Sequence, residues 1–136
     1  MNISLGEFIK FLVLLLHRNQ IKLSLRDHRP WHTLLYKLET KTRGQRRPAF
    51  LGDLQFDWDG EYPKSLELEE FLDALILNNS VVAINPQLNE YLIPKEIIML
   101  WSDCLGMLEE DATKFLDTAL ELAKKEFKES GSATRT

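Results

Sequence analysis

Hydrophobic residues recur along most of the chain at the three- and four-residue spacing of helices that bury one face. Ser4 and Glu7 form a capping-box pattern, which predicts a helix over about residues 5–17. This segment is apolar on nearly every face, so we expect it at the centre of the core. A second helix is predicted from Pro30, because proline suits the first helical turn and the residues from Trp31 onward follow helical spacing.

Between these helices and the middle of the chain the pattern changes. Residues 21–25 alternate between apolar and polar and predict a short extended segment. Residues 40–47 are polar and basic and contain glycine, which is typical of an exposed loop. Pro48 to Trp58 is partly apolar and aromatic, and it predicts a short helix or turn followed by a strand at residues 55–58.

The next segment predicts a helix followed by a β-hairpin. Ser65 is the expected N-cap of a helix that ends near Leu77. Two short β-prone runs, residues 81–84 and 90–93, flank turn residues at 85–87. The expected core stripe of the helix consists of Leu68, Phe71, Leu72, Leu75 and Ile76.

Two more helices complete the predicted fold. Pro94 begins the first, and the second covers about residues 108–127. The fold class is α+β and mostly helical: three helices and a hairpin form a winged-helix-like unit, with a C-terminal helical pair beside it. We expect residues 1–129 to form one domain and residues 130–136, which are small and polar, to be a disordered tail.

Composition indicates a soluble globular protein. The 136 residues are 44% hydrophobic and 28% charged, which is ordinary for one domain. The apolar run Phe11–Leu16 is far shorter than the roughly 20 residues that span a bilayer. The single cysteine, Cys104, lies in an apolar helical pattern, so we expect a buried thiol in a reducing cytoplasm. We predict a cytoplasmic protein with no membrane contact.

Charge is distributed unevenly along the chain. Residues 1–50 contain ten Lys or Arg and three Asp or Glu, whereas residues 51–136 contain seven and eighteen. Two interpretations follow: the basic segment 18–47 contacts nucleic acid, or the acidic half packs against it and neutralises it. Trp31 and Tyr36 would offer stacking surfaces if exposed, but the favoured interpretation has Trp31 in the core and the charges on an ordinary solvated face. The candidate nucleic-acid-binding residues are Arg26, Arg29, Lys37, Lys41, Arg43, Arg46 and Arg47.

The helix before the hairpin argues against the usual DNA-binding mode of winged-helix proteins. Such proteins commonly place this helix in the major groove. Here no Lys or Arg lies between Ser65 and Asn79, and acids would face the phosphates. The acids of this helix are Glu67, Glu69, Glu70 and Asp73, of which Glu67, Glu70 and Asp73 are the candidate protein-binding residues.

Candidate metal and catalytic groups are sparse in the sequence. Asp57, Asp59 and Glu61 alternate and offer oxygen ligands for Mg²⁺ or Ca²⁺, but they lack the remaining EF-hand pattern, so a solvated acidic turn is favoured. His28 and His32 have i,i+4 spacing, but Pro30 separates them and no His-Glu-x-x-His arrangement is present. We therefore predict no metal, no cofactor and no catalytic residue.

One segment resembles a known family. The order of elements and the sequence from Trp58 to Ser65 resemble Panacea-type antitoxin domains and their phage-associated relatives over residues 56–93. The Gly-Pro-Tyr at the centre of that family's motif is not reproduced here. The resemblance implies a winged-helix-like scaffold that binds protein, for example a toxin.

These observations favour a non-enzymatic protein-interaction or regulatory module. It would bind another protein through the acidic helix or the apolar C-terminal helix, and that last helix is also suited to a homodimer interface. The alternative is a nucleic-acid-binding regulator that uses segment 18–47. A small metal-dependent hydrolase using Asp57, Asp59 and Glu61 is a third hypothesis.

Overall fold

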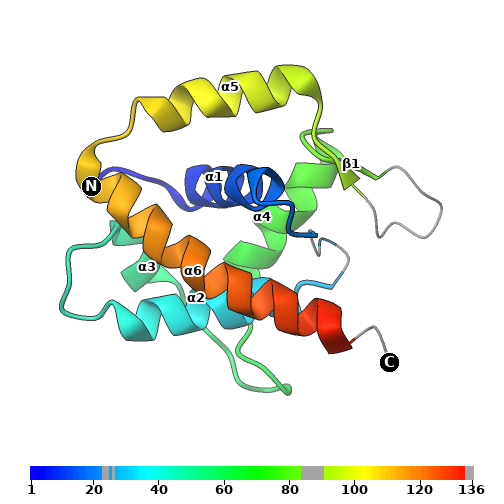
Figure 1. Cartoon of the computed structure of the whole chain (residues 1–136). Helices are drawn as coiled ribbons and strands as arrows, with labels where there is room; N and C mark the ends of the chain where they lie inside the picture. Colours follow the sequence, from blue (N-terminus) through cyan, green and yellow to red (C-terminus); the bar gives the residue numbers. More distant parts are fainter. Residues whose placement is uncertain (23–24, 26, 84–90, 134–136) are drawn as a thin grey trace.

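The computed structural model describes residues 1–22, 25, 27–83 and 91–133. Within them the chain forms six helices and one two-stranded antiparallel sheet, which confirms a mostly helical α+β fold (Figure 1). The elements are α1 (Leu5–Arg18), α2 (Arg29–Lys41), α3 (Ala49–Asp53), α4 (Leu66–Leu77), β1 (Val82–Ala83), β2 (Tyr91–Leu92), α5 (Lys95–Gly106) and α6 (Glu110–Ala133).

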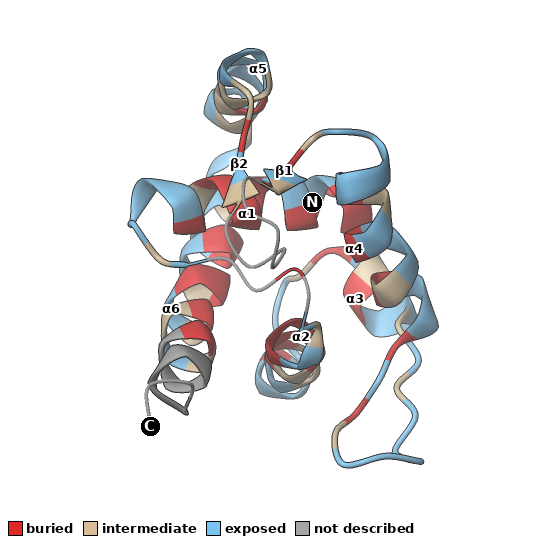
Figure 2. Cartoon of the chain, turned by 90° about the vertical axis from the view of Figure 1, so that its right-hand side faces the viewer, coloured by how far each residue is buried: buried red, intermediate tan, exposed pale blue. Residues whose placement is uncertain are grey.

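Helix α1 lies at the centre of the fold, as its sequence predicts. It packs against α4, α5 and α6, and nine of its 14 residues are buried (Figures 1 and 2). The predicted capping box is present: the Glu7 N–H donates to Ser4 Oγ at 3.1 Å, and the Ser4 N–H donates to Glu7 Oε1 at 3.2 Å. Gly6 is buried in the first turn, where a Cβ atom would lie 2.7 Å from the Phe71 ring. Glycine there allows α4 to approach α1 closely.

Helices α2 and α6 pack side by side below α1. Trp31 is fully buried and meets the Phe127 ring edge-on, with 4.9 Å between centroids. Its core position is therefore confirmed, and it is not a stacking surface. Helix α6 extends through Ala133, so residues 130–133 of the predicted tail are helical, while 134–136 lie outside the described residues.

Among the described residues of the two predicted strands, Val81 and Ile93 do not belong to a strand. In the hairpin, Val82 pairs with Leu92 and Ala83 with Tyr91. The turn predicted at 85–87 lies outside the described residues, as do parts of the segment 21–25. The strand predicted at 55–58 is wrong, because only Asp57 there forms a ladder contact, as a single antiparallel bridge with Lys64.

Three side chains expected in the core are exposed. Phe71 and Ile76 were assigned to the core stripe of α4, but α4 buries only Leu68, Leu72 and Leu75. Cys104 is exposed because α5 packs mainly against α1 and buries Trp101 alone (Figure 2). Among the described residues, none of the helices combines the length and apolar character needed to cross a bilayer.

Candidate functional site

The outward surface of α4 is the most distinctive exposed feature of the described chain. Ser65 caps the helix: its Oγ accepts from the Leu68 N–H at 3.5 Å and its hydroxyl donates to the Glu67 carboxylate at 3.0 Å. The cap and the buried leucines behind it fix which side of α4 faces solvent. An unusual mixture of apolar and acidic residues lies on that side.

Four exposed residues of α4 follow one another at spacings of four, three and four: Leu66, Glu70, Asp73 and Leu77. Residues at these spacings lie along one line of a helix. We call this set the outer stripe of α4. Leu66 is 71% exposed and Leu77 is 79% exposed, so a large apolar side chain stands at each end with two carboxylates between them. The two leucines are eleven residues, or about three helical turns, apart on this line.

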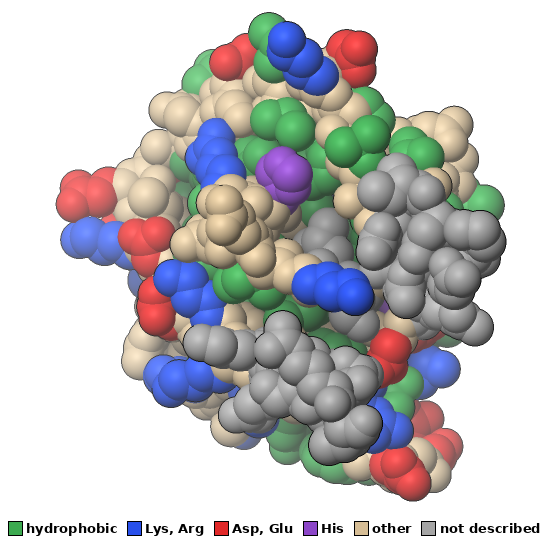
Figure 3. All heavy atoms as spheres, turned by 45° about the vertical axis from the view of Figure 1, so that its right-hand side comes forward, with side chains coloured by type: hydrophobic (Ala, Val, Ile, Leu, Met, Phe, Trp, Pro, Cys, Tyr) green, Lys and Arg blue, Asp and Glu red, His purple; other side chains and the backbone are tan. Residues whose placement is uncertain are grey.

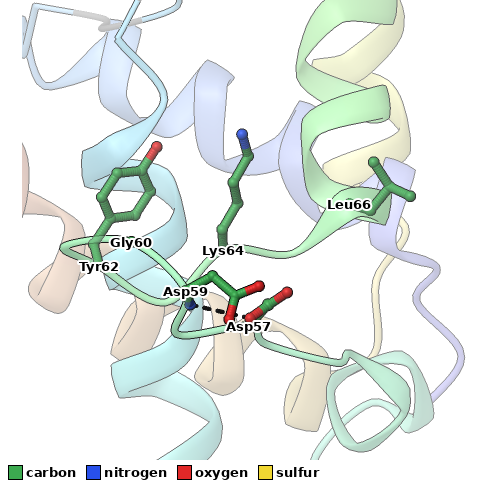
Figure 4. A pocket seen from close by; sticks show the side chains of 6 residues that line it. All are labelled: Asp57, Asp59, Gly60, Tyr62, Lys64 and Leu66. Atoms are coloured by element: carbon green, nitrogen blue, oxygen red, sulfur yellow. Dashed lines mark hydrogen bonds between the residues drawn. The ribbon is translucent and has the colours of Figure 1, made fainter.

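A hollow of about 480 Å³ continues from the outer stripe at Leu66 (Figure 4). Figure 4 shows the Asp57 and Asp59 carboxylates next to each other, with Tyr62 and Lys64 projecting along one side. The Asp59 N–H donates to Asp57 Oδ1 at 3.1 Å, which holds the turn. The lining is Asp57, Asp59, Gly60, Tyr62, Lys64 and Leu66.

The third acid of this turn does not join the other two. Glu61 accepts a hydrogen bond from Arg29 at 3.0 Å and does not line the hollow. Asp57, Asp59 and Glu61 therefore do not converge on one point, and no cation site is formed by the three together.

Behind α4, two histidines share one carboxylate oxygen. His32 is fully buried, and its Nε2 lies 2.7 Å from Glu69 Oε1. His28 approaches the same oxygen with Nδ1 at 3.0 Å, and its Nε2 lies 2.8 Å from the Leu25 carbonyl. The Ser65 N–H donates to His32 Nδ1 at 3.0 Å, so this cluster is tied to the first turn of α4.

The electrostatics of this cluster follow from burial and hydrogen bonding. Burial lowers the pKa of His32, and this effect outweighs the hydrogen bond with Glu69, which favours the charged ring. Burial alone raises the pKa of Glu69, but its hydrogen bonds to His32 and His28 outweigh that effect and hold the pKa below its usual value. The favoured state is a neutral His32 beside an ionised Glu69.

The sequence predicted an acidic helix, but not which of its acids face solvent and which contact the histidines. Glu70 and Asp73 are exposed on the outer stripe and Glu67 is exposed beside it, whereas Glu69 contacts both histidines. Asp73 also lies on the side of the stripe nearest His28, with a carboxylate oxygen within 4.8 Å of the His28 and Glu69 ligand atoms. One signal was available: Glu69 lies one residue after the buried Leu68 and three before the buried Leu72, on the edge of the core face. An acid at that position needs a partner, and histidine spacing alone does not identify it.

Most of the predicted nucleic-acid-binding residues are engaged in ion pairs. Arg26 lies outside the described residues, and Lys41 is exposed at the last position of α2. The remaining five pair with carboxylates: Arg29 with Glu61, Lys37 with Glu126, Arg43 and Arg47 with Glu39, and Arg46 with Asp111. On the face drawn in Figure 3, basic and acidic side chains are interspersed.

Comparison with family models, curated proteins and solved structures finds no match for this chain. The functional argument therefore rests on the geometry of α4 and its surroundings.

Proposed function

We propose that this chain is a non-enzymatic protein-binding module and that its contact surface is the outer stripe of α4 with the adjoining hollow. The observation that carries the proposal is the pair of strongly exposed leucines, Leu66 and Leu77, which stand on one line of a capped helix about three turns apart. Isolated exposed leucines are common, but two on one line of a helix beside a hollow favour a docking surface.

The charges around these leucines define the chemistry of the partner. Glu67 and Glu70 are exposed on α4, and Asp57 and Asp59 line the hollow. A partner that fits would present apolar side chains for the leucines and Lys or Arg for the carboxylates, since complementary charge selects and orients partners. Lys64 is the basic residue of the lining and would restrict how deeply a cation enters.

The scaffold we propose is winged-helix-like. Helix α4 is followed directly by the β1–β2 hairpin, which is the order of elements in such domains. The acids of α4 occupy the positions that would face phosphate in the common DNA-binding mode, and this supports protein in place of DNA as the ligand of α4.

Site-specific photocrosslinking in the cells that make this protein tests the proposal. A photoreactive residue at Leu77 or Leu66 should capture a partner, whereas one at the exposed Leu100 of α5 should not. The partner, once purified, should bind the Leu77→Lys variant at least about tenfold more weakly, since the loss of an apolar anchor and the addition of a charge at an interface cost more than about 1.4 kcal/mol. Leu100→Lys is the matched control and should bind like the natural chain.

Two outcomes would overturn the proposal. Crosslinking that is stronger at Leu100 than at Leu66 and Leu77 would place the contact surface on α5. An equal affinity for the Leu77→Lys and Leu100→Lys variants would remove the outer stripe from the interface. If the captured protein is a second copy of this chain, the same variants should change its sedimentation behaviour.

Nucleic-acid binding through segment 18–47 is the alternative proposal. The ion pairs of Arg29, Lys37 and Arg46 with acids from the second half of the chain make it the less supported of the two. They correspond to the interpretation in which the acidic half packs against the basic half and neutralises it.

A further inference from the structure

The hydrogen bonds around His28 assign a position to every ring proton. The Leu25 carbonyl can only accept, so His28 Nε2 carries a proton and donates it at 2.8 Å. In a neutral ring the other nitrogen, Nδ1, then has a lone pair and no proton. This Nδ1 lies 3.0 Å from Glu69 Oε1, which is itself an acceptor. This contact is favourable when Nδ1 holds either a proton or a metal ion.

The second histidine contacts the same Glu69 oxygen and does not supply a proton to His28 Nδ1. Because the Ser65 N–H donates to His32 Nδ1, that nitrogen is unprotonated. The single proton of a neutral His32 is therefore on Nε2, which donates to Glu69 Oε1 at 2.7 Å. This bond orients the Glu69 carboxylate, whose Oε1 also faces His28 Nδ1.

A third ligand lies on the open side of this contact. Asp73 is one helical turn after Glu69, and it brings a carboxylate oxygen to a point where His28, Glu69 and Asp73 each offer one atom within 4.8 Å of the others. An added proton on His28 would satisfy one contact between two groups. A divalent cation would satisfy three groups at once and would also offset the repulsion between the two carboxylates.

We propose that His28 Nδ1, Glu69 and Asp73 bind a first-row divalent transition-metal ion such as Zn²⁺. An imidazole nitrogen with two carboxylates suits these ions better than Ca²⁺ or Mg²⁺, which prefer oxygen ligands alone. Ligand atoms of tetrahedral zinc lie about 3.3 Å apart when the bonds are about 2.0–2.1 Å long. The 3.0 Å between His28 Nδ1 and Glu69 Oε1 is close to that separation.

The surrounding groups are arranged as the outer shell of a metal site. Histidine ligands usually donate their second ring N–H to a backbone carbonyl, as His28 does to Leu25. Carboxylate ligands are usually hydrogen-bonded as well, as Glu69 is by His32. The backbone N–H of His32 donates to the His28 carbonyl at 3.1 Å, which places the two histidines one turn apart at the start of α2. The metal would tie this turn to α4, and the exposed Asp73 leaves the site open to a water ligand.

Zinc binding by the full chain, stripped with EDTA and dialysed, tests the proposal by calorimetry. We expect one Zn²⁺ per chain and a rise in Tm on loading, because a ligand that binds only the folded state stabilises it. Asp73→Asn changes an exposed side chain and should preserve the fold, yet weaken zinc binding by about tenfold or more. His28→Ala should weaken zinc binding to the same extent. Asp103→Asn on α5 and His17→Ala on α1 are the matched controls and should bind zinc like the natural chain.

Spectroscopy of the His28 ring distinguishes a bound metal ion from a proton on Nδ1. Zinc should move the ¹⁵N resonance of His28 Nδ1 and leave that of His17 unchanged, and Co²⁺ should give a visible absorption spectrum that Asp73→Asn loses. If the stripped protein binds no zinc in the micromolar range, or if the Asp73→Asn and His28→Ala variants bind it as well as the controls do, the proposal is wrong. If the His28 ring stays protonated at neutral pH with excess zinc, a proton and not a metal ion lies between His28 and Glu69. Asp73 also belongs to the outer stripe of α4, whereas His28 does not, so the His28→Ala variant distinguishes a failure of the metal site from a failure of the protein-binding proposal.

Discussion

The imidazole of His32 accepts one hydrogen bond and donates another, and the two bonds together fix its tautomer. It accepts from the Ser65 N–H and donates to Glu69, while its burial lowers its pKa. The sequence placed His32 on a helix and Ser65 at a helix cap, and both assignments are correct. Their contact was not predictable, because it depends on how α2 packs beside α4 and not on any local pattern.

His32→Leu should lower the free energy of unfolding, although leucine is close to histidine in size. The buried Ser65 N–H would lose its acceptor, which costs about 1–3 kcal/mol, and Glu69 would lose a donor as well. Urea unfolding in EDTA measures this change without any contribution from bound metal. His17→Leu on the exposed end of α1 is the control and should change the value by less than about 0.5 kcal/mol. Equal effects of the two variants would mean that the His32 bonds contribute nothing to stability.

At the scale of elements, local signals located the helices well and their faces less well. The capping box of α1 and the serine cap of α4 marked helix starts that the structure confirms. Periodicity could not reveal that Phe71 and Ile76 are exposed, since a helix apolar on several sides buries only the side that meets a neighbour. The same reason explains the exposed Cys104 of α5.

The C-terminal end of α2 is stabilised by a cluster that the predicted loop did not include. Glu39 accepts from Arg43 Nε at 3.1 Å, and Arg47 reaches back to the Glu39 carbonyl at 2.7 Å. The hydrogen bond from Arg43 is the largest cause of the lowered pKa of Glu39. Residues 43–46 are exposed and lie outside the helix, as the sequence predicts, but the contacts of Arg43 and Arg47 hold this loop against the end of α2.

The stabilisation from Glu39 should depend on pH. Because the pKa of Glu39 is lower in the folded chain than its usual value of 4.5, the unfolded chain binds more protons as the pH falls. The contribution is therefore full above about pH 4.5 and is lost as the pH falls through the folded pKa. Glu39→Gln should lower Tm at pH 7, and the difference from the natural chain should shrink by about pH 3.

Thermal melts of the Glu39→Gln variant and the natural chain at pH 7 and pH 3 measure this pH dependence. Glu121→Gln removes an exposed pair with Lys124 within α6 and should change Tm little at either pH, as exposed pairs contribute about 0–1 kcal/mol. A Tm difference for Glu39→Gln that stays constant from pH 7 to pH 3 would contradict an ionised Glu39 as the source.

At the scale of the whole molecule, the charge asymmetry of the sequence does not become two separate surfaces. Arg29, Lys37 and Arg46 of the basic half pair with Glu61, Glu126 and Asp111 of the acidic half. The counts of charged residues predicted both outcomes equally, because they contain no information on which segments meet. The packing of α2 against α6 brings basic residues of the first half beside acids of the second half. That packing depends on buried side chains such as Trp31 and Phe127.

Removing the acids that pair with the basic segment should therefore create a polyanion-binding surface. The triple variant Glu61→Gln, Asp111→Asn and Glu126→Gln frees Arg29, Arg46 and Lys37, and it should elute from heparin at higher NaCl than the natural chain. A second triple variant, Glu96→Gln, Asp103→Asn and Asp117→Asn, changes the net charge equally but leaves these pairs intact. It should elute with a much smaller shift. If both variants shift equally, net charge and not local pairing controls polyanion binding. If the natural chain already binds duplex DNA with a steep salt dependence, segment 18–47 is accessible and the nucleic-acid alternative is the better one.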